Sequence, residues 1–318
     1  MALKIKKAVR EQVYTKIALM GSSGSGKTYS ALRLAKGMAE ALSKQLGRPA
    51  KILMANTEGS RGVYYANEFD YDICDIEAPY SPETYIELIN DAVEAGYDIL
   101  ILDSASPEWD GKGGCLELHT MLGGRQTDWK DISPRHNKFL DTIEKSPIHI
   151  VATLKGKDAY EIDKDANGKV SVKKLGLGVR QRDGFEFIFS CTFSIDQKTH
   201  IAQAQKDNTH IFEGSAGEIL SEDYGKRIIA WANSSEVAPS KNYVVQNAEE
   251  NKAEQEKLFA ETREKIKEIA LALNKEGRSA DYQKVVELFL PNKKVMDCTV
   301  EDLPTMVKIL DGLVEATK

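Results

Sequence analysis

The sequence predicts an α/β protein with a mostly parallel central sheet and a small helical domain at its C-terminal end. Short apolar segments alternate with amphipathic helical patterns along residues 16–232, an order typical of a sheet covered by helices on both faces. Residues 97–103 are almost continuously apolar, as expected for a strand at the centre of a parallel sheet. Residues 253–318 carry apolar residues at helical spacing, which predicts a separate helical domain.

The elements of the α/β part follow from these periodicities. Each expected strand is a short apolar run, and each expected helix has its apolar residues on one face. Pro134 is expected to open the third helix, because proline fits the first helical position. The strands are expected at residues 16–20, 51–55, 97–103 and 148–153, with later strand-like segments at 185–195 and 199–205, and the helices at 27–46, 82–96 and from 134 onward.

The chain is expected to divide into three parts. Residues 1–232 form the core domain, and residues 233–252 are polar, with the Asn, Ser and Pro residues of a linker. Residues 253–318 form the helical domain. Its last apolar stripe consists of Met306, Ile309, Leu310 and Leu313.

Composition and charge exclude several protein classes. The chain has 318 residues, with 42% hydrophobic and 29% charged residues, which is ordinary for a globular protein and excludes collagen-like and globally disordered chains. A net charge of −6 excludes a bulk polycation, so any nucleic-acid site must be a local patch. Residues 155–182 are such a candidate, with eight Lys or Arg against four Asp or Glu. The alternative for this segment is a solvated hairpin or flap.

The spacing of the cysteines and histidines indicates no metal centre built from these residues. The four cysteines lie far apart in the sequence, and the five histidines show no ligand spacing. The N-terminus lacks the apolar region of a signal peptide, and no apolar run approaches the length of about 20 residues that crosses a membrane. We therefore expect a cytoplasmic protein with reduced thiols and no membrane partner.

One motif predicts a nucleotide site. Residues 21–28 fit the pattern GxxxxGK[ST] and lie between an expected strand and an expected helix. In such a loop the backbone N–H groups surround phosphate oxygens, Lys27 reaches the β- and γ-phosphates and the Thr28 hydroxyl ligates Mg²⁺. The sequence thus predicts binding of ATP or ADP with Mg²⁺. The expected nucleotide-binding residues are Gly21, Ser22, Ser23, Gly24, Ser25, Gly26, Lys27, Thr28 and the adjoining Tyr29.

Two carboxylates are candidates for the rest of the chemistry. Asp103 ends the most apolar strand, where a second Mg²⁺ ligand is needed, although an ordinary strand-ending Asp would look the same. The next residue is Ser104, so a residue that activates water must come from elsewhere. Glu58, just beyond the strand at 51–55, could orient the attacking water, and the alternative is a solvated turn residue.

Together these features resemble the RecA-like ATPase core and, more narrowly, the RecA-like AAA-type ATPases encoded beside phage recombination genes, including single-strand annealing ATPases. The resemblance covers residues 14–232. It rests on the phosphate-binding loop, on Glu58 and on Asp103, which is followed by a serine and not by a glutamate. It also rests on the segments at residues 103–109, 129–136, 152–160 and 181–187.

The resemblance implies further roles. Thr153 falls where RecA senses the γ-phosphate, and Tyr65 where RecA stacks an aromatic ring on adenine. Lys206 falls where a basic residue reaches the ATP of the neighbouring subunit. Residues 155–182 fall at a DNA-binding loop.

The resemblance also implies partners. They are a homo-oligomer, as a ring or a filament, single-stranded DNA, and a recombination or single-strand-binding protein, in a bacterial host cytoplasm if the gene belongs to a phage.

Three functions remain open at this point. The first is a Mg²⁺-dependent ATPase, catalysed by Lys27, Glu58, Asp103 and Lys206, that acts on single-stranded DNA. The second is an interaction module whose ATP state controls binding to a protein partner. The third is a P-loop kinase, for which Arg180 and Arg182 could serve the transferred phosphate.

Overall fold

The structure is a computed structural model that describes residues 7–164, 170–235, 242–291 and 293–316. For residues 157–164, 170–177, 242–255, 301, 304, 315 and 316 it describes the backbone alone. The contacts divide the chain into two compact units, residues 1–240 and residues 241–318, which are described separately.

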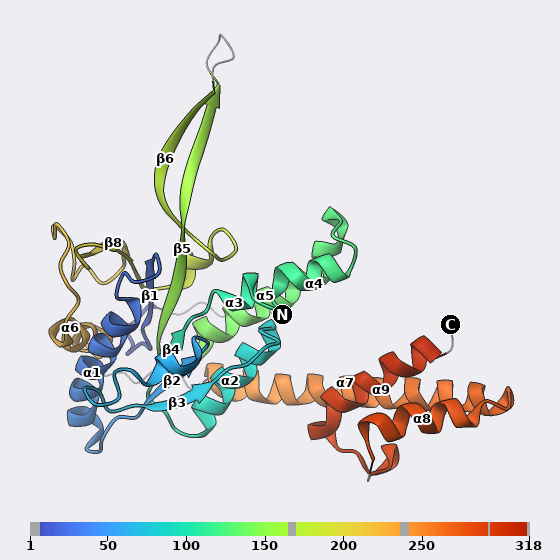
Figure 1. Cartoon of the computed structure of the whole chain (residues 1–318). Helices are drawn as coiled ribbons and strands as arrows, with labels where there is room; N and C mark the ends of the chain where they lie inside the picture. The colour runs from blue at the N-terminus through green and yellow to red at the C-terminus, as the bar shows by residue number, and fades with distance from the viewer. Residues whose placement is uncertain (1–6, 165–169, 236–241, 292, 317–318) are drawn as a thin grey trace. The chain divides into compact units, whose positions relative to one another are not determined.

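The first unit is built on an eight-stranded sheet in which seven strands lie in the order β3-β2-β4-β5-β1-β7-β8 (Figure 1). All neighbours from β3 to β7 are parallel, β8 is antiparallel to β7, and β6 pairs antiparallel with β5 alone. The predicted mostly parallel sheet is therefore confirmed. The strands are β1 (Lys16–Gly21), β2 (Ile52–Asn56), β3 (Asp72–Asp75), β4 (Ile99–Asp103), β5 (His149–Lys164), β6 (Val170–Val179), β7 (Cys191–Ile195) and β8 (Ala202–Asp207).

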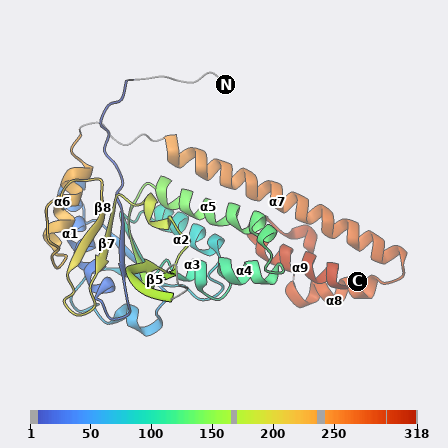
Figure 2. The ribbon, with the colours of Figure 1, turned by 90° about the horizontal axis from the view of Figure 1, so that it is seen from above.

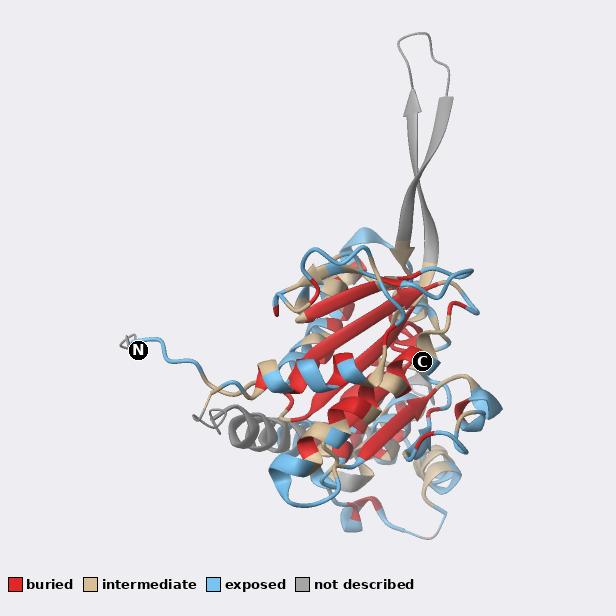
Figure 3. Ribbon diagram, turned by 90° about the vertical axis from the view of Figure 1, so that its left-hand side faces the viewer, coloured by how far each residue is buried: buried red, intermediate tan, exposed pale blue. Residues whose placement is uncertain are grey.

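Helices cover both faces of this sheet (Figure 2). The alternation of side chains along β1 shows the two layers, because Ile17 and Leu19 pack with α1 and α6, whereas Ala18 and Met20 pack with α2 and α5. Figure 3 shows the buried strands between these layers. The helices are α1 (Lys27–Leu46), α2 (Pro82–Glu94), α3 (Pro107–Asp110), α4 (Cys115–Met121), α5 (Trp129–Lys145) and α6 (Glu222–Ala232), with short 3-10 helices at Gly59–Val63, Gln126–Asp128 and Phe185–Ile188.

Several elements differ from the sequence prediction. Residues 185–188, expected in a strand-like segment, form a 3-10 helix, and the strand β7 begins only at Cys191. Helix α5 begins at Trp129, so the prediction that Pro134 opens it was wrong, and Pro134 lies inside the helix. The helix tolerates this proline because it lies near the helix start and removes only one hydrogen bond, the one from its own N–H to the carbonyl oxygen of Lys130. Strand β3 was not predicted, because all four of its residues are exposed and it lacks an apolar run.

The basic segment that follows β5 is a long β-hairpin. Strand β5, expected to end at residue 153, continues to Lys164 and pairs antiparallel with β6. Figure 1 shows this hairpin projecting from the edge of the sheet at which β5 leaves it. The segment therefore extends well beyond the packed core. Its glycines and charges had predicted a solvated hairpin or flap as one alternative, without the length of its strands.

The second unit contains the helices α7 (Asn242–Lys275), α8 (Ser279–Phe289) and α9 (Leu303–Ala316), with 3-10 turns at Val295–Asp297 and Val300–Asp302. Its core is formed by the residues of the predicted stripes, among them Phe259, Ile266, Leu273, Met306, Ile309 and Leu313. Residues 242–252, expected in a linker, lie in α7. Gln246, Ala248, Glu249, Glu250 and Lys252 favour a helix, so the polar composition of this stretch did not distinguish a helix from a linker. Among the described residues, no helix combines the length and apolar character that a membrane span requires.

Candidate nucleotide-binding site

The phosphate-binding loop joins the buried strand β1 to helix α1. Gly24 and Gly26 have φ values of +81° and +88°, a left-handed conformation that glycine adopts without strain. Lys27 Nζ donates hydrogen bonds to the carbonyl oxygens of Gly21 (2.9 Å) and Ser22 (2.8 Å). Burial lowers the pKa of Lys27, and the nearby carboxylates of Asp103 and Glu58 oppose that shift. The lysine therefore lies folded over the loop, within reach of a phosphate placed there.

A cavity of about 790 Å³ opens beside this loop. Its volume falls in the range of about 300–1,000 Å³ that is common for small-molecule sites. It brings together residues from seven separate segments of the sequence, at 23–33, 58–65, 103–104, 153–156, 180, 200 and 219–220. Of the predicted nucleotide and catalytic residues, it is lined by Ser23, Gly24, Gly26, Lys27, Thr28, Tyr29, Glu58, Tyr65, Asp103 and Thr153, but not by Gly21, Ser22, Ser25 or Lys206.

Asp103 lies between two threonine hydroxyls. Thr28 Oγ1 donates to its Oδ2 at 2.7 Å, and Thr153 Oγ1 donates to its Oδ1 at 2.5 Å. Burial raises the pKa of Asp103, and the two hydroxyl hydrogen bonds oppose the rise. Asp103 is only 4% exposed and forms no ion pair with any side chain that the structure describes. A buried carboxylate with a hydroxyl beside it and no paired cation suits Mg²⁺, so Thr28 and Asp103 could hold that ion.

Glu58 reaches the cavity from the turn after β2. Its Oε1 lies 2.8 Å from Lys155 Nζ, and its Oε2 lies 3.2 Å from Arg61 Nη1. Burial alone would raise the pKa of Glu58, but its contacts with Lys155, Arg61 and Lys27 give a net lowering. Glu58 thus lines the cavity, and its role in orienting water stays a prediction. Both of its oxygens, however, already face cations.

Residues 14–244, more than two thirds of the chain, match the family model of the AAA domain. The chain belongs to the AAA domain family. This family consists of AAA-type P-loop ATPases, in agreement with the loop and the sheet described above. No curated protein matches the chain at a significant level.

Aromatic side chains form another part of the wall in this AAA domain. The rings of Tyr29 and Tyr65 meet edge to face with centroids 5.2 Å apart, and the Tyr29 hydroxyl donates to Glu68 Oε2 at 3.0 Å. Tyr65 also packs against the core on the α1 side of the sheet. These rings offer an apolar surface of the kind on which a nucleotide base packs.

Lys206 lies in β8 and does not line the cavity of its own AAA domain. Its Nζ donates to the carbonyl oxygen of Phe187 at 2.6 Å. A role at a neighbour's nucleotide therefore stays a prediction.

The sequence reasoning missed a contact between the loop and the turn that joins β7 to β8. Gln197 Nε2 donates to the carbonyl oxygen of Ser23 at 2.9 Å, and His200 Nδ1 donates to that of Ser25 at 3.0 Å. His200 also lines the cavity. These residues follow the loop by more than 170 positions, and no local pattern marks them. Only the pairing of β1 with β7 brings them together.

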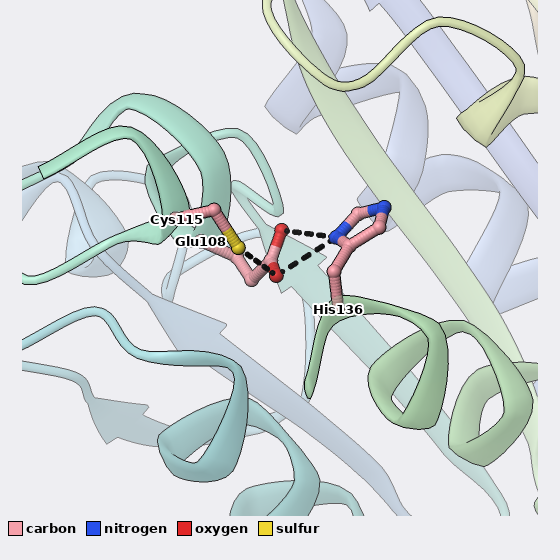
Figure 4. A group of neighbouring side chains, drawn as sticks. All are labelled: Glu108, Cys115 and His136. Atoms are coloured by element: carbon pink, nitrogen blue, oxygen red, sulfur yellow. Dashed lines mark hydrogen bonds and ion pairs between the residues drawn. The ribbon is translucent and has the colours of Figure 1, made fainter. Parts of the chain in front are cut away.

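A second cluster is formed by side chains from α3, α4 and α5 (Figure 4). Glu108, Cys115 and His136 are fully buried, and their ligand-type atoms lie within 4.8 Å of one another. Cys115 Sγ and His136 Nδ1 donate to the Glu108 carboxylate, at 3.1 and 3.0 Å, and Gln181 Nε2 donates at 3.0 Å. Sequence spacing had indicated no such group.

These donors satisfy the buried carboxylate without a metal ion, and the described residues provide only three ligands. The cluster is therefore explained as an anchor that ties Gln181, just beyond the end of β6, to the core of the AAA domain.

Proposed function

We propose that this AAA domain protein binds ATP with Mg²⁺ and hydrolyses its terminal phosphate. The observation that carries the proposal is the convergence of Lys27, Thr28, Asp103 and Glu58 on one cavity. In hydrolysis, Lys27 would leave the carbonyls of Gly21 and Ser22 to neutralise charge on the phosphates, and Thr28 and Asp103 would hold Mg²⁺. Bound Mg²⁺ supplies further neutralisation of the phosphate charge.

Glu58 has the remaining role in this proposal. It orients a water molecule toward the γ-phosphorus and accepts a proton from it. A new bond then forms between the water oxygen and phosphorus, and the bond from phosphorus to the bridging oxygen breaks, which releases ADP and phosphate.

We further propose that the protein assembles into a ring or filament and acts on single-stranded DNA, with the hairpin at residues 155–182 as the contact. The hairpin projects from the sheet, and its excess of basic residues suits a phosphate backbone. Residues 165–169 at its tip lie outside the described residues. Lys206 would complete the ATP site of the neighbour. We also propose a recombination or single-strand-binding protein as a partner.

One observation favours a second candidate function, an interaction module gated by nucleotide. Lys155 and Arg61 occupy both oxygens of Glu58, so the proposed water-orienting group is not free in this structure. A protein in this state would bind ATP and turn it over only incidentally. Its ATP state would control binding to a protein partner.

Steady-state ATP hydrolysis over a series of protein concentrations, with and without single-stranded DNA, tests the proposals. Lys27→Ala is the control, and its folding is checked by circular dichroism. Stimulation by DNA, with a rate that rises more than linearly with protein, would support an assembled ATPase. A slow, linear rate that DNA does not change, abolished in Lys27→Ala, would favour the interaction module. A rate that Lys27→Ala leaves unchanged would refute both.

A further inference from the structure

Arg180 is a cation of the nucleotide cavity to which the proposed hydrolysis gives no role. It lines that cavity together with Lys27, Asp103 and Glu58. Its side chain is 56% exposed, and its Nη1 lies 3.7 Å from Oδ2 of Asp110. This separation exceeds the length of an N–H···O hydrogen bond, about 2.7–3.2 Å. A guanidinium has several N–H donors in a planar fork, so one long contact leaves it able to bind an anion that enters the cavity.

The other lysines and arginines of the cavity wall that the structure describes have closer partners. Lys27 Nζ donates to carbonyl oxygens of the phosphate-binding loop at 2.8 and 2.9 Å. Arg33 Nη2 lies 2.8 Å from a carboxylate oxygen at the start of α6. Lys155 and Arg61 lie 2.8 and 3.2 Å from the two oxygens of the carboxylate proposed to orient water. Arg180 therefore gives up the weakest contact when it turns to a phosphate.

The backbone of Arg180 is fixed to the part of the sheet that carries the phosphate-binding loop. Its N–H donates to the carbonyl oxygen of Lys155 at 2.7 Å, and Lys155 is the register partner of Gly21, the first residue of that loop. The ammonium group of Lys155 lies 2.8 Å from Glu58 Oε1. Arg180 is therefore held at the end of the cavity that contains Glu58, where the proposed hydrolysis requires the terminal phosphate.

The next residue, Gln181, fixes this segment to a second part of the core. Gln181 is 2% exposed, and its Nε2 donates to the carbonyl oxygen of Ala105 at 3.2 Å and to Glu108 Oε2 at 3.0 Å. Ala105 follows Asp103, the proposed Mg²⁺ ligand, by two residues. The hydrogen bonds of Gln181 thus limit the movement of Arg180 relative to the carboxylate of the metal site.

We propose that Arg180 is a further catalytic residue, which donates hydrogen bonds to the terminal phosphate of ATP, and that Gln181 is its positioning residue. In the transition state the transferred phosphoryl group carries its charge on its equatorial oxygens, and a planar guanidinium can donate to two of them. ADP lacks this phosphate, so the same contact makes the protein prefer ATP to ADP. The inference rests on the proposed ATPase function.

The first test compares ATP hydrolysis by the wild type, Arg180→Met and Arg180→Lys in the presence of Mg²⁺ and without nucleic acid. Removal of one donor to a developing charge lowers kcat by about 100-fold or more, and we expect a loss of this order in Arg180→Met. Arg180→Lys keeps the charge without the planar fork and should lose less.

Arg48→Met is the matched control for this test. Arg48 is 48% exposed and pairs with the carboxylate of Asp98, but it does not line the cavity. Its kcat should equal that of the wild type. Circular dichroism checks the folding of each variant, and Arg180→Gln replaces Arg180→Met if the latter does not fold. A kcat in Arg180→Met equal to that of Arg48→Met would overturn the inference.

A second measurement separates this inference from the ATPase proposal, because it needs no turnover. Calorimetric titrations with ADP and with the non-hydrolysable β,γ-imido analogue of ATP, both with Mg²⁺, give the ratio of the two dissociation constants. A hydrogen bond to a charged group contributes about tenfold in affinity, so the preference for the ATP analogue should be about tenfold smaller in Arg180→Met. It should be unchanged in Arg48→Met. An unchanged preference in Arg180→Met would overturn the contact, whether or not the protein hydrolyses ATP.

The same preference tests the positioning role of Gln181. Gln181→Met removes both hydrogen bonds of the amide and should reduce the preference for the ATP analogue. In the double variant with Arg180→Met the reduction should not exceed that of Arg180→Met alone, because Gln181 acts through Arg180. Additive reductions would overturn the positioning role. If Gln181→Met fails to fold, Gln181→Asn takes its place. If Lys27→Ala leaves turnover unchanged, the ATPase proposal fails, while the preference still decides whether Arg180 contacts the terminal phosphate.

Discussion

Thr153 donates a hydrogen bond of 2.5 Å from its hydroxyl to Oδ1 of Asp103, although 50 residues separate them in the sequence. The contact arises because β5 lies between β1, which leads into the phosphate-binding loop, and β4, which ends at Asp103. Thr28 donates to the other oxygen of the same carboxylate. The Asp103 carboxylate is thus held by a threonine at the start of helix α1 and by a threonine in strand β5.

Replacement of Thr153 by Val should destabilise the protein, because the fully buried hydroxyl is one of two donors that satisfy a buried carboxylate. We expect the free energy of unfolding to fall by about 1–3 kcal/mol, the cost of a buried polar atom without its partner. Urea denaturation without nucleotide measures the change. Thr153→Ser keeps the hydroxyl and should lose less. Equal stability of the Val variant and the wild type would contradict the importance of this bond.

The parts of the site that the sequence predicted are local motifs at strand ends. The loop at residues 21–28 carries its own pattern, and Asp103 and Glu58 each follow an apolar strand, so the parallel sheet brings them to one edge. The contacts of His200 and Lys155 depend instead on strand order and on the turn geometry of distant segments, which no local pattern encodes.

As with the site, the parts of the fold that the sequence predicted are those with a local pattern. Apolar runs revealed the central strands. Strand β3 lacks such a run, and all four of its residues are exposed. The two strands of the hairpin carry charged residues and glycines in place of an apolar run. The cluster around Glu108 was not foreseen, because the carboxylate and its partners Cys115, His136 and Gln181 are far apart in the sequence and meet only through packing.

His200→Ala should weaken nucleotide binding, because His200 Nδ1 donates to the carbonyl oxygen of Ser25 inside the phosphate-binding loop. The loss of one hydrogen bond of about 1 kcal/mol predicts an affinity for ATP about fivefold lower. Titration with a fluorescent ATP analogue measures it. His210→Ala is a matched control, because His210 has a similar φ of +58° but pairs with Glu213, away from the loop. Equal affinity of both variants would refute a role for His200 in ordering the loop.

His149 should make stability depend on pH. It is 3% exposed, and its Nδ1 accepts hydrogen bonds from the backbone N–H and the hydroxyl of Thr15. Burial, aided by the charge of Lys16 and opposed by Asp98, lowers its pKa from 6.5 to about 3. Below pH 6.5 the unfolded chain therefore binds a proton that the folded chain does not. The stability contributed by the neutral histidine is complete above pH 6.5 and is lost as the pH falls toward 3.

The slope from one such group reaches about 1.4 kcal/mol per pH unit. Urea unfolding between pH 8 and pH 5 should show it in the wild type and a shallower dependence in His149→Asn, whatever the absolute stability of the variant. A difference in stability between the two proteins that stays constant over this range would show that His149 does not titrate as described.

Lys206→Ala should lower ATP turnover and leave ATP binding intact if the lysine acts on a neighbour's nucleotide. The residue does not line its own cavity, so its loss removes no contact there. A cation supplied to the transferred phosphate by another subunit contributes about 10³- to 10⁵-fold in related systems, and a smaller but clear loss of kcat is expected here. Lys198→Ala, at an exposed lysine in the turn before β8, is the control.

Mixing two variants with complementary defects tests the same role directly. Lys27→Ala subunits lack the phosphate lysine but keep Lys206, and Lys206→Ala subunits have the opposite defect. If Lys206 serves the neighbour, some interfaces in a mixed assembly join an intact loop to an intact Lys206, and turnover returns in part. Size-exclusion chromatography with one labelled variant confirms that the two assemble together. A residue that acts across the interface must be replaceable by the partner's copy, so co-assembly without any recovery of turnover would place Lys206 outside the neighbouring site. Equal losses of ATP binding and turnover in Lys206→Ala alone would lead to the same conclusion.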